Sequence, residues 1–330
     1  MVPHKGILCD PWSVSKERQE IQCTVTGEED GQKLDRLVAR YAGVSRRIAR
    51  ILISRGAVKA NGRGVKILTK PMKAGVKLLI EKSLVEEAGQ KKGKKIELHE
   101  ADILYKDRWL VGIYKPSGLL SETDRLGSPS VQTLLPELLE SQGESGEVHL
   151  VHRLDAGTSG VLVLARKPNI ARAMHELFRQ KKLKKIYLAL SQGRLKKDHW
   201  CDAPIKRMPG QVARHGVHPE GKPSRTYLKE LAFHDDNSLV LAQPKTGRTH
   251  QIRVHLAHLE CPILGDKRYG GKAYIGEDYR PVHRPMLHAY ALEFKHPKSS
   301  EPVCVEGPPR SDFKGLAESL GLWQNEFTLA

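Results

Sequence analysis

Two amphipathic segments near the start of the chain predict a pair of short helices. In residues 34–41 the apolar side chains recur every three or four positions, which is the period of one helix face. A second helix is expected over residues 46–55, because Ser45 is a good N-cap and Gly56 stands where a helix end favours positive φ. Arginines occupy much of the surface that this second helix leaves to solvent.

Short apolar runs around these helices predict strands at residues 21–26, 57–60 and 76–80. Asn61 and Gly62 follow the second of these runs and form a dipeptide typical of a tight hairpin turn. The first 85 residues therefore predict a small α/β unit.

The pattern changes after residue 96, where longer apolar runs predict a larger unit. The expected strands are residues 109–114, 148–151, 160–165, 186–190, 226–233 and 239–243. The expected helices are 170–181, with Asn169 as its cap, and 249–259. Because strands and helices do not alternate one for one, the sequence favours an α+β domain with a mixed, mostly antiparallel sheet flanked by helices.

The same pattern gives a domain layout. Residues 1–20 have no clear period and are expected to form an arm, and 21–85 form the small unit. Residues 86–95, EEAGQKKGKK, are charged and poor in apolar side chains, which predicts a linker. The larger unit takes 96–330.

Charge then indicates a partner. Lysine and arginine outnumber aspartate and glutamate by 55 − 38 = 17. The excess is uneven, since residues 33–82 hold 14 basic residues against Asp35 and Glu81. A second basic cluster lies at 179–185. An uneven excess favours a polyanion-binding face, and nucleic acid is the usual polyanion.

Other classes of protein fit poorly. The five cysteines are scattered and form no CxxC pair, which predicts reduced thiols in a cytoplasmic protein without a zinc site or disulfide framework. No run has membrane-spanning length, and the first twenty residues lack the apolar core of a secretory signal. His255 and His258 share a helix face, but no acid stands at matching spacing, so RNA contact or packing is favoured over metal binding.

The small unit resembles a known RNA-binding domain. LDRLVARYAGVSRRIARILISRGAVKANGRGV, from Leu34, is similar to the domain named after ribosomal protein S-four. It supplies the Leu-Asp pair, the Ser-Arg before the second helix, the Gly that ends it and the turn, with Ala60 in place of a second Val. The resemblance implies RNA contact, for which we expect Arg46, Arg47, Arg50, Arg55 and Asn61.

Asp155 is the candidate for chemistry in the larger unit. It follows an expected strand and precedes a Gly/Thr/Ser loop, which can present a carboxylate to a cleft on a rigid support. The pattern alone also fits an ordinary turn aspartate.

Five ordered blocks within residues 96–300 resemble the RluA-type pseudouridine synthases. The signature-like block is VHRLDAGTSGVLVLARKP, from Val151. The others are DRWLVGIYKPSG from Asp107, KKIYLAL from Lys184, PKTGRTHQIRVHLAHLECPILGDKRYG from Pro244 and RPMLHAYALEFKHP from Arg284. An N-terminal S-four-type domain is common in this family, so the two resemblances agree.

This resemblance implies isomerisation of uridine to pseudouridine in RNA, without cofactor or metal. Asp155 is the implied catalytic carboxylate, Arg253 its partner and Tyr187 the active-site tyrosine, with Leu287 in apolar contact with the substrate. Further substrate contacts are expected from residues in the same blocks: His152, Arg153, Thr158, Arg248 and Lys115. Large-subunit ribosomal RNA is the expected substrate, transfer RNA is the alternative, and a monomer is expected.

Some roles stay open at this stage. Arg153 either fills the space that a flipped uridine vacates or contacts a phosphate. Asp155 can attack the sugar, attack the base or remove a sugar proton. Tyr114 stands where the family usually has Asn, outside the implied catalytic set, so we expect it to affect packing or substrate choice.

Two other classes of function compete with an isomerase. A ribosome-associated RNA-binding protein could keep the fold without catalysis, but the retained Asp155, Tyr187 and Arg253 disfavour it. A glycosylase or other hydrolase would need a second carboxylate to activate water, and no convincing partner stands near the motif.

Overall fold

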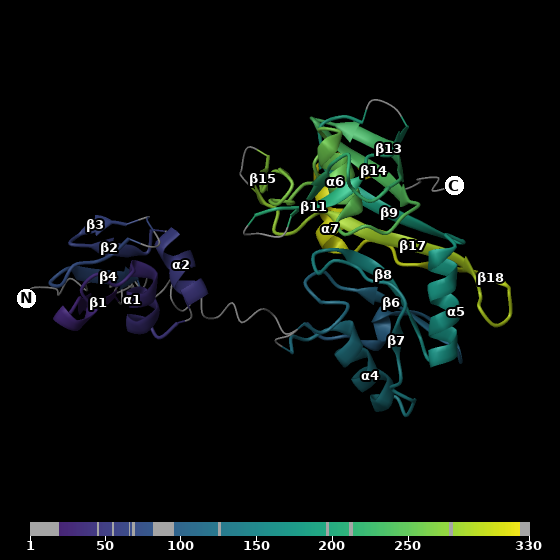
Figure 1. Cartoon of the computed structure of the whole chain (residues 1–330), viewed down its shortest axis with the longest axis horizontal. Helices are drawn as coiled ribbons and strands as arrows, with labels where there is room; N and C mark the ends of the chain where they lie inside the picture. Colours follow the sequence, from purple (N-terminus) through teal and green to yellow (C-terminus); the bar gives the residue numbers. More distant parts are fainter. Residues whose placement is uncertain are drawn as a thin grey trace, which may run out of the picture. The chain divides into compact units, whose positions relative to one another are not determined.

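The computed structural model describes residues 20–44, 46–54, 56–65, 67, 70–81, 96–124, 127–195, 198–210, 214–276 and 280–323. Contacts divide the chain into two compact units, residues 1–95 and 96–330 (Figure 1). Several expectations lie outside the described residues: the arm before residue 20, the linker at 86–95, Ser45, Arg55 and the side chains of Arg47 and Ile48.

The two helices of the first unit form as the hydrophobic period predicts. Helix α1 spans Leu34–Tyr41 and α2 spans Arg46–Ser54. Their apolar stripes meet in one buried core with strand residues, formed by Leu34, Leu37, Val38, Ala49, Leu52, Ile53, Val58, Leu78 and Ile80. The helices are therefore stabilised by burying one face each, as expected for segments too short to be helical alone.

An antiparallel sheet completes this unit. Its strands are β1 (Glu20–Thr24), β2 (Val58–Ala60), β3 (Arg63–Gly64) and β4 (Lys77–Glu81), in the order β1-β4-β2-β3. Asn61 and Gly62 both have positive φ, 47° and 77°, and join β2 to β3. The Asn-Gly dipeptide thus makes the hairpin that the sequence predicts.

The second unit is built on one large sheet. Its principal strands are β5 (Ile103–Lys106), β6 (Leu110–Lys115), β8 (Ser159–Ala165), β9 (Leu183–Gln192), β10 (His199–Cys201), β13 (Thr226–His234), β14 (Asn237–Pro244) and β17 (Leu287–Lys295). They lie in the order β10-β13-β14-β9-β17-β8-β6-β5. Two short strands pair with this path, β7 (His149–Leu150) and β18 (Pro302–Glu306). Small hairpins are formed by β11 (Ile205–Met208) with β12 (Arg214–Val217), and by β15 (Tyr274–Ile275) with β16 (Arg280–Pro281).

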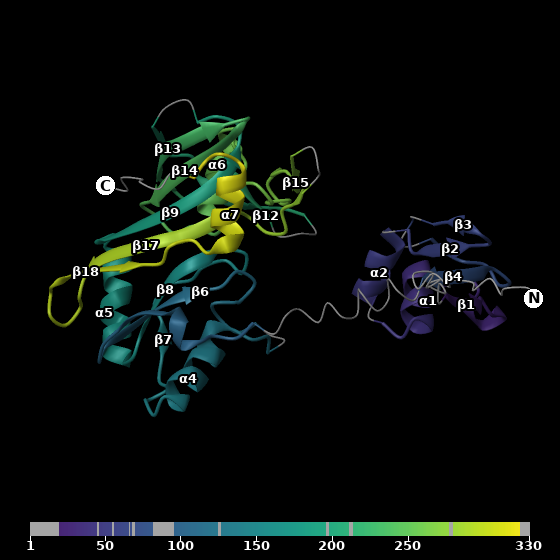
Figure 2. The ribbon, with the colours of Figure 1, turned by 180° about the vertical axis from the view of Figure 1, so that it is seen from behind.

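Among the described strands of the large sheet, β17 and β8 pair in parallel and the other neighbours pair antiparallel. This confirms the mixed, mostly antiparallel sheet and the α+β class predicted from the sequence. The helices are α4 (Val131–Ser141), α5 (Pro168–Arg179), α6 (Gln251–His258) and α7 (Ser311–Ser319), the last of which lies in front of the sheet in Figure 2. None of the described helices has the length and apolar character that crossing a membrane requires.

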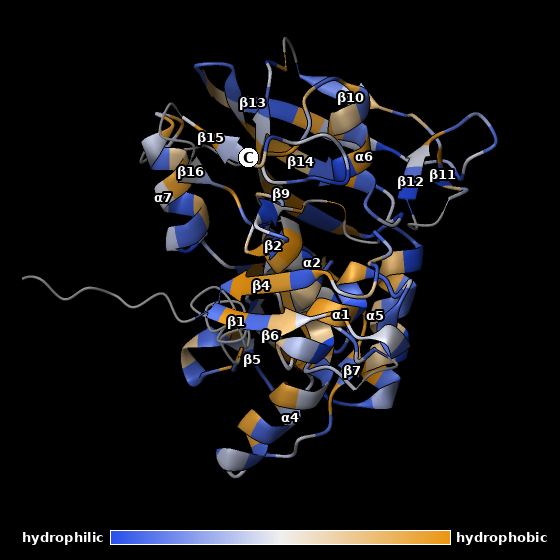
Figure 3. Cartoon of the chain, turned by 90° about the vertical axis from the view of Figure 1, so that its left-hand side faces the viewer, coloured by the Kyte–Doolittle hydropathy of each residue, from blue (hydrophilic) through white to orange (hydrophobic). Residues whose placement is uncertain are grey.

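Strand β8 is buried on both faces. Leu162 and Leu164 pack in a core with α4, whereas Val161 and Val163 pack in a different core with α5. Because neighbouring side chains on a strand point to opposite faces, α4 and α5 cover opposite sides of the sheet here. Figure 3 shows hydrophobic and hydrophilic residues alternating along α4, as expected for a helix with one face in the core.

The start of β8 needs a glycine. A Cβ on Gly160 would lie 2.0 Å from the carbonyl oxygen of Ala289 on β17, and the φ of Gly160 is 112°. Both the space and the backbone angle exclude an ordinary side chain. This close approach fixes the loop that contains Asp155 against the first residues of β17.

Two expected helix starts are wrong. Helix α5 begins at Pro168 with Lys167 at the N-cap position, so Asn169 lies inside the helix. Proline is well suited to a first helical position, and this preference prevails over the capping ability of asparagine. Helix α6 begins at Gln251, two residues later than expected, because His250 has the left-handed conformation φ 58°, ψ 22°.

Candidate active site

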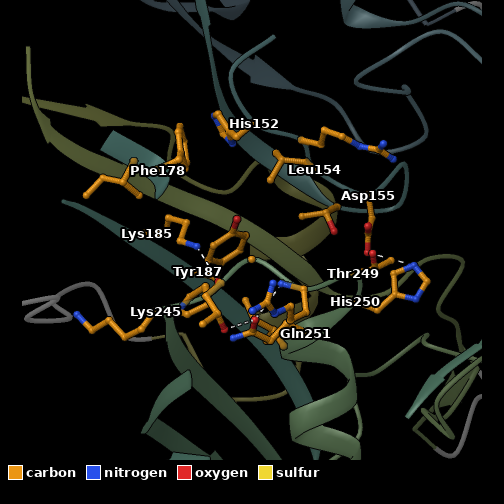
Figure 4. A pocket seen from close by; sticks show the side chains of 18 of the residues that line it. His152, Leu154, Asp155, Phe178, Lys185, Tyr187, Lys245, Thr249, His250 and Gln251 are labelled. Carbon is orange, nitrogen blue, oxygen red and sulfur yellow. Dashed lines mark hydrogen bonds and ion pairs between the residues drawn. The ribbon is translucent and has the colours of Figure 1, made fainter. Parts of the chain in front are cut away.

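The cleft of the second unit lies against one face of β9, in the middle of the large sheet, and encloses about 630 Å³. Its walls come from the loop between β7 and β8, from β9, and from the segment that joins β14 to α6. Figure 4 shows Asp155 and Tyr187 both projecting into this space. Residues far apart in the sequence therefore meet in one cleft because neighbouring strands place them side by side.

The loop that contains Asp155 is held from behind by the segment after β6. The Ser121 hydroxyl donates to the Leu154 carbonyl at 2.9 Å and accepts from the Leu154 N–H at 3.0 Å. The Gly118 N–H donates to the Ala156 carbonyl at 2.7 Å. These bonds fix the backbone on both sides of Asp155, so its carboxylate starts from a rigid base.

Lys115 belongs to the same support. The sequence predicts that it contacts the substrate, and this prediction is wrong. The side chain is fully buried and does not line the cleft. Its ammonium group donates to the carbonyls of Pro116, Leu119 and Ala156 at 3.0, 2.8 and 3.3 Å. Burial lowers the pKa of Lys115 to about 7, with the charge of Arg284 adding to the effect and that of Asp155 opposing it.

Arg284 ties this loop to the start of β17. Its Nη1 donates to the carbonyls of Gly157 at 3.3 Å and Leu287 at 3.3 Å. Its Nε donates to Asp312 on α7 at 2.8 Å. One guanidinium therefore connects the Asp155 loop, the apolar cleft residue Leu287 and the last helix.

The Asp155 carboxylate is paired with Arg253, as the family resemblance implies. Arg253 Nη1 donates to Asp155 Oδ2 at 3.1 Å. The other side of the guanidinium is occupied by Asp266, whose oxygens accept from Nε at 2.6 Å and from Nη2 at 2.8 Å. Burial disfavours the charged guanidinium, but the hydrogen bonds and charge of Asp266 outweigh this and raise the pKa of Arg253.

Tyr187 faces the same space from β9. Its ring is half-buried and lines the cleft. Burial raises the pKa of the Tyr187 phenol well above its usual range, and the negative charge of Asp155 adds to this shift. The hydroxyl therefore stays protonated at neutral pH and is available as a hydrogen-bond donor.

The cleft brings together most of the expected substrate contacts. Its lining includes His152, Arg153, Thr158, Arg248 and Leu287. The His152 ring stacks on Phe178 with 5.0 Å between the ring centroids. Arg153 is exposed over 74% of its side chain and forms an ion pair with Glu122, so it can change position at little cost.

The basic rim of the cleft was partly predicted. Arg179, Lys181 and Lys185, from the second basic cluster of the sequence, line it together with Lys245. Lys185 donates to the Thr246 carbonyl at 2.9 Å. Burial lowers its pKa to about 8, and the charge of Lys245 adds to this effect. The opening thus presents positive charge to an incoming polyanion.

Arginines of the first unit surround a buried acid. Arg50 Nε and Arg46 Nη2 donate to Asp35 at 2.7 and 2.9 Å, and both arginine side chains are 48% exposed. Burial would raise the pKa of Asp35, but these two hydrogen bonds outweigh it and lower the pKa. Because two arginines pair with one aspartate, the surface of α2 keeps a net positive charge. Asn61 is exposed, and its side-chain oxygen accepts from the Lys77 N–H at 2.9 Å.

Sequence reasoning gave no site role to three residues of the network around Asp155 and Arg253. These are Asp266, His250 and Tyr269, and all three lie in the block from Pro244 that was compared with the family. The available signal was the concentration of polar residues at the end of that block. Nothing in their spacing indicates that they converge on one guanidinium and one carboxylate.

Of the two helical histidines, His255 acts in packing, whereas His258 is exposed. The His255 ring lies 2.8 Å from the Thr226 hydroxyl and 2.9 Å from the Ala203 carbonyl. Across the part of the chain that the structure describes, no group of three potential ligands is placed to hold a metal ion.

The chain is similar to known proteins over most of its length. Residues 110–258 match the family model for RNA pseudouridylate synthase. The chain is 34% identical over 295 residues to the ribosomal large subunit pseudouridine synthase C of Yersinia pestis, covering 86% of this chain and 91% of that protein. It is 33% identical over 307 residues to the protein of that name from Escherichia coli strain K12, covering 90% and 95%. The solved structure of human RNA pseudouridylate synthase domain containing 4 matches with a TM-score of 0.57 and 28% identity, over 68% of this chain and 95% of that one.

The buried ion pair between Arg253 and Asp266 predicts a stability effect. Asp266→Asn removes one charge from a pair in which both side chains are nearly inaccessible, and we expect it to lower the free energy of unfolding by about 2–3 kcal/mol. The matched control is Glu220→Gln, which breaks an exposed pair with Lys206 and should cost less than about 1 kcal/mol. Urea unfolding of the full chain measures both. Equal losses in the two variants would contradict this account.

Proposed function

Because the chain belongs to the RluA-type family of RNA pseudouridine synthases, we propose that it converts specific uridines to pseudouridine in large-subunit ribosomal RNA, with Asp155 as the catalytic carboxylate. The observation that carries the role of Asp155 is its contact with the clamped Arg253 guanidinium, inside a cleft with basic residues at its rim. The relatives named above support ribosomal RNA as the substrate. Transfer RNA is the alternative substrate, and a non-catalytic RNA-binding protein is the alternative function.

The reaction breaks the bond between the anomeric carbon of the ribose and N1 of uracil. The base then turns and rejoins the sugar through C5, and the proton at C5 is lost while N1 gains one. No oxidant or reductant is required, and no water is added. The task of the protein is to hold the base and sugar in place and to provide one reactive carboxylate.

Asp155 is suited to this task in its ionised form. The Arg253 guanidinium stabilises the negative charge and fixes the direction of the carboxylate. The side chain is 33% exposed, so an oxygen can reach a substrate atom in the cleft. This geometry serves attack on the sugar, attack on the base and removal of a sugar proton alike.

Tyr187 and Leu287 are proposed to hold the uracil base in the cleft. The Tyr187 ring can stack on a flipped uracil, and its protonated hydroxyl can direct a proton at C5. Leu287, at the start of the neighbouring strand β17, supplies an apolar contact in the same lining. The uridine must leave its stack first, which costs a few kcal/mol. Arg153, exposed at the cleft, either fills the vacated space or binds a phosphate.

The first unit is proposed to hold the RNA. Its positive charges on α2 and its hairpin turn at Asn61 supply phosphate contacts that do not depend on sequence. We propose that residues 21–85 form an S-four-type RNA-binding domain, that 96–330 form the catalytic domain, and that the protein works as a monomer in the cytoplasm.

Asp155→Asn tests the catalytic role. The amide keeps the shape of the side chain but carries no charge, so we expect the rate of pseudouridine formation to fall by more than about 10³-fold while RNA binding is kept. Mass spectrometry of a ribosomal RNA fragment before and after incubation measures the product. Formation at the wild-type rate would refute the assignment.

The RNA-binding role of the first unit predicts a change in salt dependence. Arg46→Gln removes one exposed charge and leaves Arg50 on Asp35, so the slope of log Kd against log salt should become shallower by about 1. Arg46→Lys keeps the charge and should keep the slope. Filter binding of ribosomal RNA at several salt concentrations gives these slopes, and an unchanged slope in Arg46→Gln would exclude phosphate contact by this residue.

A further inference from the structure

His250 stands beside the Asp155 carboxylate in a backbone conformation that histidine seldom adopts. Its φ of 58° and ψ of 22° lie in the left-handed region, which costs a residue with a side chain about 1–3 kcal/mol. The left-handed turn immediately precedes α6, and the side chain is only 12% exposed. Its Nε2 lies 3.6 Å from Asp155 Oδ2, and Figure 4 shows the ring next to the carboxylate.

The other nitrogen of the ring is fixed by Tyr269. His250 Nδ1 and the Tyr269 hydroxyl are 2.8 Å apart. The same hydroxyl accepts the backbone N–H of His215, on β12, at 3.2 Å. Because the Asp155 carboxylate beside Nε2 can only accept, a neutral ring satisfies both of its neighbours when the Tyr269 hydroxyl directs its own proton to Nδ1. This places the hydrogen of a neutral His250 ring on Nε2, the nitrogen that faces Asp155.

The surroundings keep this ring neutral. Burial lowers the pKa of His250 to about 4, against the opposing charge of Asp155, and Arg253 and Arg268 add to the lowering. A neutral ring with its hydrogen on Nε2 is a hydrogen-bond donor without a formal charge. It can therefore direct the carboxylate without neutralising it.

Arg253 and His250 both approach the same oxygen of the Asp155 carboxylate. Arg253 Nη1 donates to Oδ2 at 3.1 Å, and His250 Nε2 approaches Oδ2 at 3.6 Å. No residue that the structure describes makes a hydrogen bond to Asp155 Oδ1. Catalytic hydrogen bonds are often long before substrate binds and shorten in the complex. With Oδ2 bonded to Arg253 and faced by His250, Oδ1 is the oxygen left for the substrate.

We propose that His250 is a positioning residue that donates from Nε2 to Asp155 Oδ2, with its tautomer set by Tyr269, so that Oδ1 is presented to the uridine. This inference rests on the proposed role of Asp155. It assigns a function to three residues, His250, Tyr269 and the backbone of His215, that the sequence comparison left without one.

Two substitutions of His250 distinguish a positioning role from a purely structural role. Gln places its amide nitrogen where Nε2 lies, so His250→Gln keeps a donor to Asp155. Asn places its polar atoms where Nδ1 lies, so His250→Asn keeps the contact to Tyr269 and loses the donor. Asn tolerates the left-handed conformation better than Gln does. A purely structural role therefore favours Asn, whereas the positioning role favours Gln.

The experiment measures single-turnover rates and KM on a ribosomal RNA fragment, together with melting temperatures of the full chain. We expect His250→Asn to lower the rate about 10- to 100-fold with little change in KM, and His250→Gln to remain within about 5-fold of wild type despite a lower melting temperature. His234→Asn, at the exposed end of β13 and outside the cleft, is the control and should match wild type.

Tyr269→Phe tests the tautomer. It should slow the reaction when residue 250 is His, because the Nε2 hydrogen is no longer fixed. It should have a smaller effect in the His250→Gln variant, whose amide has no tautomers. Equal losses in the Asn and Gln variants, losses that follow the melting temperatures, or an equal effect of Tyr269→Phe in both backgrounds would overturn the inference. An inactive wild-type enzyme would instead count against the proposed function.

Discussion

The site depends on one buried guanidinium held between two carboxylates. Arg253 and Asp266 are 9% and 1% exposed, and a charge at such a depth is stable only when it is paired and hydrogen-bonded. Asp266 satisfies this need through two parallel hydrogen bonds, which also fix the plane of the guanidinium. Nη1 is then directed at Asp155. The position of the reactive carboxylate is in this sense set by an acid that does not itself face the substrate.

The sheet explains how residues so distant in sequence come together. Strands β14, β9, β17 and β8 are consecutive neighbours, so the Asp155 loop before β8, the start of β17 and Tyr187 on β9 lie side by side. Gly160 allows β8 to approach β17 closely enough for this arrangement. Lys115, Ser121 and Arg284 then hold the carbonyls of the Asp155 loop from outside the cleft. Rigid support of this kind is what precise positioning of a reactive group requires.

The spacing of apolar residues predicted the elements that depend on local sequence. It did not predict features that depend on contacts between distant segments. Helix α1 and the Asn61-Gly62 turn follow from the spacing of apolar residues and from the backbone preferences of two residues. The family resemblance supplied Asp155, Tyr187 and Arg253, which share the cleft. Lys115 was misjudged, since its burial depends on three carbonyls that only the folded loop brings together. The start of α6 was missed because the left-handed turn at His250 is held by contacts with Tyr269 and Asp155, not by local preference.

We expect Asp266 to act on the chemistry through Arg253, without a separate effect on Asp155. A double-mutant cycle on the rate of pseudouridine formation, with Arg253→Lys, Asp266→Asn and the combined variant, tests it most directly. Lysine cannot reproduce the paired hydrogen bonds, so once Arg253 is replaced Asp266 has no fixed guanidinium left to orient. We therefore expect the combined variant to be about as slow as the slower single variant. Losses that multiply would show that the two residues act independently and would contradict it.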